Sequence, residues 1–242
     1  MEGAGFSLGL GLTAATPDPL PLSGLSCWYD PSDTATLFQD MAGTVPVVTD
    51  GTPVALMRDK SGNGNNMVQS AVAARPVYRT AGGRHWLEFD GVDDVMSCPT
   101  APSAPNASAA LSFAHIGFKS GFATLFRSGT DMPRMYLVQT APSHIRCFWG
   151  SGFLFVSRSS AISTLGIVSA ITLVSGNSAQ IHSGGQSGTA TGLTPGAATG
   201  GMTLGNPDFH GRIHGLAYYA QALDTATQAQ LGRYLDSLAG LP

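Results

Sequence analysis

Clusters of glycine, asparagine, aspartate and serine interrupt the apolar runs of this chain at intervals of about 8–12 residues. The clearest clusters are Ser61–Gly64, Gly82-Gly83, Asp90-Gly91, Gly176-Asn177 and Gly184-Gly185. Intervals this short accommodate single strands but not the helices that connect parallel strands. Glutamate and lysine, which long surface helices need, occur only at Glu2, Glu88, Lys60 and Lys119. We therefore predict an all-β fold in which two antiparallel sheets pack face to face.

The segments between these turns are the predicted strands. They are Leu25–Tyr29, Val54–Met57, His85–Phe89, Val95–Ser97, Ala110–Phe118, Ala123–Arg127, Arg134–Gln139, His144–Trp149, Leu154–Ser157, Gly166–Val174, Ala179–Ser183, Met202–Gly205 and Arg212–Ala220. The glycine-rich segment Gly184–Gly201 is predicted to be a long hairpin or loop.

The C-terminal segment has a helical pattern instead. Thr225–Gln228 fits a capping box that begins a helix. Apolar residues then recur at helical spacing and helix-ending residues follow, namely Leu231, Tyr234, Leu235 and Leu238, then Gly240 and Pro242. We predict one short C-terminal α-helix of about three turns that lies on the sandwich with its four apolar side chains inward.

Residues 1–22 are rich in glycine and proline and bury little apolar surface among themselves. Phe6, Leu8, Leu10 and Leu12 alternate with serine and glycine, which is the pattern of a strand with one apolar face. We predict that residues 1–22 form an assembly arm and that residues 23–242 form the sandwich. No lysine or arginine precedes the apolar stretch and glycines interrupt it, so we expect neither a secretory signal nor membrane insertion.

The charge and cysteine content argue against several classes of function. The formal net charge is −3 and no basic stripe is present, so we expect no nucleic-acid surface. Cys27, Cys98 and Cys147 are odd in number and far apart in the chain. We predict that they are small buried side chains rather than disulfide partners or metal ligands.

Several motifs occur in a defined order over residues 25–240, including the phrases DKSGNGN and LEFDGVDD. They are Cys27–Asp33 followed by Thr36–Phe38, then Arg58–Asn66, Arg75–Tyr78 and Leu87–Asp94, and finally Phe209–Tyr219 with Ala222 and Leu223. This series resembles the concanavalin-A-like, laminin-G-like domains of bacteriophage and gene-transfer-agent virion surface proteins. The resemblance implies a concanavalin-A-like jelly-roll sandwich.

The resemblance also implies a function. Such domains belong to head spikes, head fibres or tail fibres, where they attach to other virion proteins or to cell-surface glycans. We accordingly expect a virion structural protein, made in a bacterial cytoplasm, that contacts other virion proteins through its N-terminal arm. We also expect it to form homo-oligomers and to bind host cell-surface polysaccharide. The alternative from another class is a free carbohydrate-binding or glycoside-hydrolase-like domain.

Catalytic patterns are weak in this sequence. Glycoside hydrolysis needs two carboxylates on either side of the sugar bond, and Glu88 with Asp90 is the one pair that would share a strand face. No G-x-S-x-G elbow is present, and His210 and His214 lie too far apart along a strand to share a zinc ion. We predict surface or interface roles for these histidines, no catalytic residues, and a protein that is not an enzyme.

Two acidic turns offer oxygen ligands of the kind that Ca²⁺ prefers. Asp59 and Asn63 lie in the first turn, and Asp93 and Asp94 lie in the second beside Asp90. The same residues also form turns without any ion. Calcium is the one cofactor that the sequence leaves open.

Aromatic side chains beside polar turns are candidates for stacking on sugar rings. Trp149 and Phe153 bracket the predicted hairpin tip Gly150–Gly152, and Tyr219 follows Tyr218 on a strand where the two face opposite ways. We predict Trp149, Phe153 and Tyr219 as glycan contacts, with packing in the core as the alternative for each.

Overall fold

The computed structural model describes residues 20–21, 23–100, 107–118, 122–128, 134–138, 143–149, 152–158, 167–175, 177–183, 186–193 and 201–241. The predicted arm residues Phe6, Leu8, Leu10 and Leu12 lie outside the described residues. Leu20, near the end of the predicted arm, is buried against the outer face of the sandwich.

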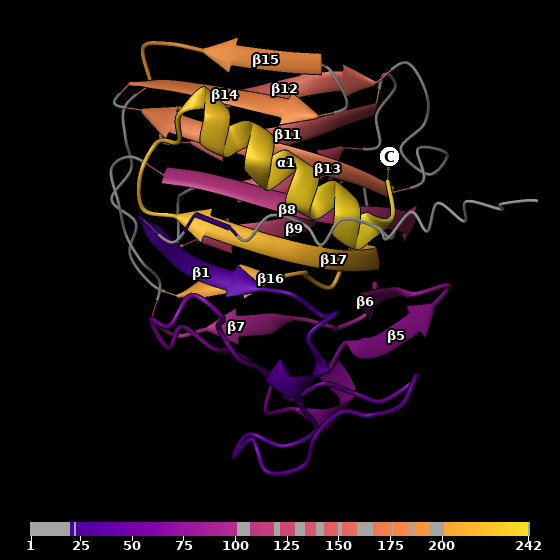
Figure 1. Cartoon of the computed structure of the whole chain (residues 1–242). Helices are drawn as coiled ribbons and strands as arrows, with labels where there is room; N and C mark the ends of the chain where they lie inside the picture. The colour runs from indigo at the N-terminus through magenta and orange to yellow at the C-terminus, as the bar shows by residue number, and fades with distance from the viewer. Residues whose placement is uncertain are drawn as a thin grey trace, which may run out of the picture.

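One of the two sheets has eight strands, all paired antiparallel (Figure 1). Its order is β15 (Gln186–Ala190), β14 (Ser178–Ser183), β13 (Ile167–Ser175), β8 (Ala107–Phe118), β17 (Phe209–Tyr219), β6 (Arg84–Asp90) and β5 (Val77–Ala81), with β1 (Leu25–Tyr29) beside β17. Strand β17 is the centre of this sheet, because it pairs with β8 along one edge and with β6 and β1 along the other.

The other sheet has nine strands, also antiparallel. Its order is β12 (Gly152–Arg158), β11 (Ser143–Trp149), β10 (Arg134–Val138), β9 (Phe122–Ser128), β16 (Met202–Leu204), β7 (Met96–Cys98), β4 (Met67–Val68), β3 (Leu56–Met57) and β2 (Leu37–Phe38). Two 3₁₀ turns, η1 (Thr34–Thr36) and η2 (Val72–Ala74), lie in the connections. The prediction of a two-sheet antiparallel sandwich is confirmed.

The main core lies between the two sheets. It unites buried residues of the eight-stranded sheet, such as Phe89, Phe113 and Ile213, with buried residues of the nine-stranded sheet, such as Met135 and Leu204. Within β7, β14 and β16 buried residues alternate with half-buried or exposed ones, as expected for strands with one face in the core. Cys27, Cys98 and Cys147 are buried, as predicted for small core side chains.

Helix α1 (Thr225–Ala239) covers the outer face of the eight-stranded sheet, across β8, β13 and β17 (Figure 1). Its apolar side chains form a second core with this sheet, made of Leu20, Leu25, Ala110, Ala217, Tyr219, Leu223, Leu231, Tyr234 and Leu235. The helix was predicted, and Leu231, Tyr234 and Leu235 are buried as expected, while Leu238 is only half-buried.

The predicted start of the helix needs a correction of one residue. The N-cap is Asp224, whose carboxylate accepts a hydrogen bond from the Thr227 N–H at 2.8 Å, rather than Thr225. The helix ends as predicted at Gly240, whose φ of 67° is in the left-handed region.

A buried polar cluster attaches α1 to the sandwich. The hydroxyl of Tyr234 on the helix donates to Asp30 at 2.8 Å and accepts from the Trp28 indole at 2.9 Å. Lys60 pairs with Asp30 at 2.9 Å and lies 4.4 Å from the Trp28 ring centroid. Burial alone would raise the pKa of Asp30, but Ser32, Lys60 and Tyr234 outweigh it, so the pKa is lowered.

The predicted histidine positions are partly wrong. His214 is 2% exposed and packs against Trp86, so it is not a surface residue. Its Nδ1 contacts the carbonyl of His85 at 3.2 Å, and burial lowers its pKa to about 4. His210 is half-buried on the same strand. No helix within the described ranges is long and apolar enough to cross a membrane.

Candidate functional site

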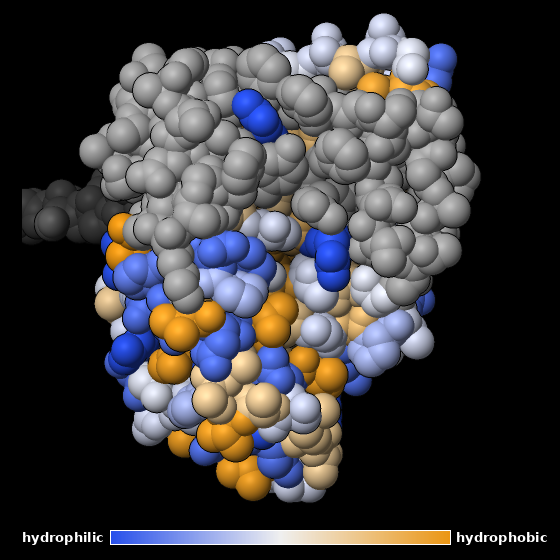
Figure 2. Space-filling view, turned by 180° about the vertical axis from the view of Figure 1, so that it is seen from behind, coloured by the Kyte–Doolittle hydropathy of each residue, from blue (hydrophilic) through white to orange (hydrophobic). Residues whose placement is uncertain are grey.

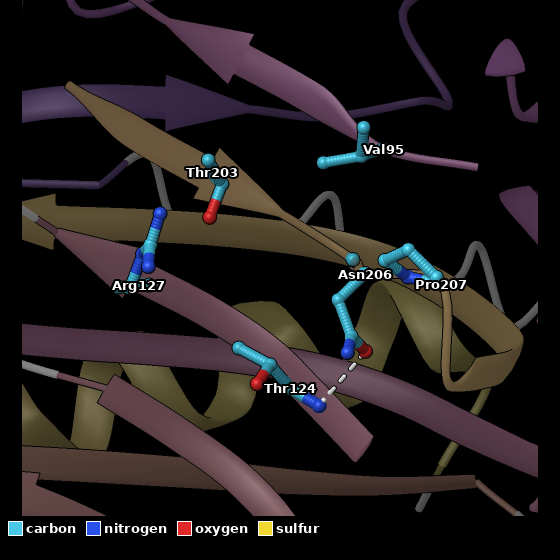
Figure 3. Close-up of a pocket in the computed structure, with 7 residues that line it drawn as sticks. Val95, Thr124, Arg127, Thr203, Asn206 and Pro207 are labelled. Atoms are coloured by element: carbon cyan, nitrogen blue, oxygen red, sulfur yellow. Dashed lines mark hydrogen bonds between the residues drawn. The ribbon is translucent and has the colours of Figure 1, made fainter. Parts of the chain in front are cut away.

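A hollow of about 300 Å³ opens on the outer side of the nine-stranded sheet, where β9, β16 and β7 are neighbours. Figure 2 views the molecule from the side opposite to α1 and shows this face hollowed near its middle. The lining is mainly polar and consists of Val95, Thr124, Arg127, Thr203, Gly205, Asn206 and Pro207. Hydroxyl, amide and guanidinium groups therefore share one depression (Figure 3).

A shift of register in β9 brings Thr124 and Arg127 to the same side. Residues three apart on a regular strand face opposite ways. Here the pairing with β10 jumps from Phe126 to Thr124, and both Leu125 and Phe126 are fully buried in the core. This bulge re-aims the strand, so Thr124 and Arg127 both line the hollow.

The turn after β16 forms the other wall. Asn206 accepts a hydrogen bond from the Thr124 N–H at 3.0 Å, drawn dashed in Figure 3, and its amide contacts Asp208 at 3.3 Å. Gly205 has a φ of 74°, and a Cβ there would meet the Phe89 ring at 2.4 Å. Only glycine fits this position, so the turn that holds Asn206 depends on it.

The predicted glycan-stacking residues have different outcomes. Tyr219 is fully buried beneath α1, so the prediction that it contacts a sugar is wrong. Trp149 and Phe153 are described by their backbone alone. Trp149 pairs with Gly152, and Phe153 belongs to a cross-sheet row of paired positions that also includes Arg127. Their role as sugar contacts stays a prediction.

The predicted calcium ligands belong to two separate networks. In the first, the Asp59 carboxylate accepts hydrogen bonds from the backbone N–H groups of Trp28 and Ser61 at 2.9 Å and Asn65 at 3.1 Å, and from the Ser61 hydroxyl at 2.7 Å. The side-chain amide of Asn63 donates to backbone carbonyls of β1 at 2.9 and 3.3 Å. Asp59 and Asn63 thus hold their loop on β1.

The second network is the acidic turn after β6. Carboxylate oxygens of Asp90, Asp93 and Asp94 lie within 4.8 Å of one another. Asp94 is 4% exposed and accepts the Asp90 N–H at 2.9 Å. Burial raises the pKa of Asp94 to about 6, and the neighbouring charges of Asp90 and Asp93 act in the same direction. The structure therefore groups the carboxylates of Asp93 and Asp94 with that of Asp90, and it places Asp59 and Asn63 on either side of the Ser61 hydroxyl, at 2.7 and 3.0 Å. Calcium binding stays a prediction.

Glu88, weighed with Asp90 as a hydrolytic pair, lies on the outer face of the other sheet. Its carboxylate pairs with Arg79 at 3.4 Å and Arg212 at 3.5 Å, and it accepts from the Trp86 indole at 3.4 Å. Asp90 is exposed at the end of the same strand. Glu88 is thus part of an ion-paired row rather than of the hollow.

The two antiparallel sheets with one closing helix define a β-sandwich, and the same fold occurs in sugar-binding and glycosidase structures. A similar solved structure is domain 4 of AbnA, a GH43 extracellular arabinanase from Geobacillus stearothermophilus, in complex with arabinotriose. The TM-score is 0.58 and the identity 15%, over 86% of this chain and 98% of that domain.

Two glycosidases share the fold over part of their length. Trypanosoma rangeli sialidase matches with a TM-score of 0.57 and 11% identity, over 90% of this chain and 33% of the sialidase. A GH54 α-L-arabinofuranosidase matches with a TM-score of 0.59 and 10% identity, over 77% of this chain and 51% of that protein. This chain therefore spans about a third and about half of their respective lengths. No protein-family model matches the chain, and no curated protein matches it.

These structures correct one prediction. The chain was expected not to be an enzyme, but its fold recurs in glycoside hydrolases, so that expectation is contradicted. Identities of 10–15% show the fold alone and specify no reaction.

Sequence reasoning missed the hollow. Thr203 and Arg127 were predicted only as strand residues, and no role was predicted for Asn206. The available signal was the polar residue Thr203 between Met202 and Leu204, which marks an outward position on a buried strand. The convergence of Thr203 with Arg127 depends on non-local pairing between β16 and β9.

Proposed function

We propose that this chain is a carbohydrate-binding domain and that the hollow on the nine-stranded sheet is its sugar-binding site. The observation that carries the proposal is the set of polar groups in one depression: the hydroxyls of Thr124 and Thr203, the Asn206 amide and the Arg127 guanidinium. Sugars present many hydroxyl groups, and a concave site with a few convergent donors and acceptors suits them.

The comparison with domain 4 of the arabinanase supports this proposal. That structure contains arabinotriose, and nearly all of that domain is covered by the match. An isolated domain of this fold and size can therefore hold an oligosaccharide, whereas the sialidase and arabinofuranosidase matches cover only parts of larger proteins.

A glycan array followed by calorimetry tests the proposal. We expect the full chain to bind at least one polysaccharide or oligosaccharide, and T203F to abolish that binding because an aromatic ring would fill the hollow. Thr189→Phe is the matched control, since Thr189 is an exposed strand residue of the other sheet. Loss of binding in both variants, or in neither, would contradict the proposed location.

The oligosaccharides that bind are also the substrates for a test of hydrolysis, a reaction that the fold neither shows nor excludes. Bound oligosaccharides are incubated with the chain, and release of reducing sugar is measured for the native protein and for Glu88→Gln. Turnover that Glu88→Gln abolishes would assign the chemistry to Glu88.

For the biological setting we propose attachment of a phage-like particle to host polysaccharide. The support is the ordered series of motifs from Cys27 to Leu223, which resembles virion surface domains. In this setting the segment 1–22 contacts other virion proteins and the domain forms homo-oligomers. Immunogold labelling of purified particles tests the location, and particles that carry no label would contradict it.

A further inference from the structure

The charge of the hollow indicates which class of sugar it accepts. Among the described residues that line it, Arg127 is the one with a charge. Its Nε atom is buried and has no hydrogen-bond partner within the described part of the chain. A half-buried guanidinium without a counter-charge is costly, because its lost hydration is not replaced.

Three other arginines of this protein have polar partners within the described part of the chain. Arg79 pairs with Asp50 and Glu88 at 3.4 Å, and Arg212 pairs with Glu88 at 3.5 Å. Arg75 donates three hydrogen bonds to backbone carbonyls. Arg212 also has a buried Nε without a hydrogen-bond partner, but it has the Glu88 carboxylate nearby, whereas no carboxylate among the described residues lies within salt-bridge distance of Arg127.

An anion bound in the hollow would supply the acceptors that the buried Nε of Arg127 lacks among the described residues. The guanidinium would then recover hydrogen bonding that its partial burial takes from water.

The nearby acids do not neutralise Arg127. Asp208 contacts the Asn206 amide at 3.3 Å, and Asp94, next to the lining residue Val95, accepts the Asp90 N–H. Both carboxylates are therefore directed to other groups. The lining itself offers Arg127 only neutral neighbours, of which Thr203 is its direct cross-strand partner.

We infer that the hollow binds an anionic glycan, with Arg127 holding a carboxylate or sulfate of the sugar and the two threonine hydroxyls contacting its hydroxyl groups. This inference rests on the proposed function and adds the class of ligand to it. Guanidinium is suited to this task, because its planar donors match the two oxygens of a carboxylate.

The test compares charged with neutral polymers on the full chain. Polygalacturonate and chondroitin sulfate are the anionic probes, and linear arabinan and dextran are the neutral probes. We expect tighter binding of an anionic probe and a loss of about tenfold or more in its affinity for Arg127→Gln. R127K should retain part of the affinity. Binding should also weaken in 0.5 M NaCl, because the Debye length is then about 4 Å and exposed charges are screened.

Arg233→Gln is the matched control, because Arg233 is exposed on α1 and its change alters net charge equally. An equal loss in Arg233→Gln would show a general charge effect and overturn the inference. Neutral probes bound as tightly as anionic ones, with T203F abolishing both, would overturn the inference and leave the proposed function standing. No binding of any probe would overturn both. Thermal unfolding of Arg127→Gln verifies that the variant is folded.

Discussion

The two outer faces of the sandwich differ in what covers them. On the eight-stranded sheet, α1 covers the face, and polar atoms of Asp30, Tyr234 and Trp28 hydrogen-bond to one another. On the nine-stranded sheet, no described helix covers the hollow, where the buried Nε of Arg127 has no partner among the described residues. Buried polar atoms without a partner occur on both sheets, among them the Tyr219 hydroxyl beneath α1, so the position of Arg127 in an open hollow is what distinguishes it as a candidate for binding.

The largest effect should come from the apolar contact between α1 and its sheet. Leu235 is fully buried there, so Leu235→Ala should lower the free energy of unfolding by about 3 kcal/mol. Chemical denaturation measures the change. Leu238→Ala is the control, since Leu238 is half-buried and should cost clearly less. Equal losses of unfolding free energy in the two variants would contradict the burial of Leu235 between α1 and the sheet.

The polar cluster under α1 should have the next largest effect. Asp30→Asn removes the charge that faces Lys60 and should lower the free energy of unfolding by about 2 kcal/mol at pH 7. The loss is limited because Lys60 keeps a second partner, Asp33 at 3.1 Å. Because folding lowers the pKa of Asp30, its contribution is present above the unfolded value of 3.8 and is lost as the pH falls below it.

The measurement for Asp30 is the unfolding free energy from pH 7 down to pH 3. The difference between native protein and Asp30→Asn should shrink as the pH falls through 3.8. The Asp33 side chain is 39% exposed, so Asp33→Asn should change the free energy of unfolding by less than about 1 kcal/mol. A pH-independent difference would contradict the assigned ionic role.

A smaller effect of opposite sign is expected at the edge of the open face. Folding raises the pKa of Asp94 from 3.8 to about 6, so its ionisation increasingly opposes folding as the pH rises between these values, and opposes it fully above pH 6. Asp94→Asn should therefore raise stability at pH 7.5 by about 1 kcal/mol, a gain that fades as the pH falls from 6 toward 4. Thermal unfolding at several pH values measures it. Destabilisation at pH 7.5 would show that the charged carboxylate is needed, as a bound cation would require.

The smallest effect should distinguish the two faces directly. Thr203→Val removes a hydroxyl from the hollow and should change the unfolding free energy by less than about 0.5 kcal/mol. Ser108→Ala removes a hydroxyl that bonds the Gln221 carbonyl at 2.8 Å and the Leu223 N–H at 3.1 Å under the helix, and should cost about 1–2 kcal/mol. Equal costs would contradict the comparison.

Much of the fold was predictable because strands and helices follow from the spacing of apolar residues that are close together in the sequence. Leu25–Tyr29 was predicted with the bounds that the structure has, and the helix was placed within one residue at its start. The sequence did not predict β2 and β4, because a strand of two residues shows no alternation, or β5, because its sequence is mixed. β15 lies in the segment Gly184–Gly201, which was predicted only as a long hairpin or loop.

The site was less predictable because it depends on register. Thr124 and Arg127 share a side only through the bulge in β9, which no local pattern indicates. Tyr219 was predicted as a sugar contact because alternation shows that two neighbours face opposite ways, but not that a helix covers the second face.

The pairing of β1 with β17 has a consequence for how the chain is made. Leu25 pairs with Tyr219, so the first strand of the domain finds its partner only when nearly all of the sequence has been synthesised. Strand β17 also separates β8 from β6, so the eight-stranded sheet cannot close before β17 arrives. We expect nascent chains that end before Phe209 to expose unpaired edges and to depend on chaperones, and folding to be slow compared with that of a helical protein of similar size.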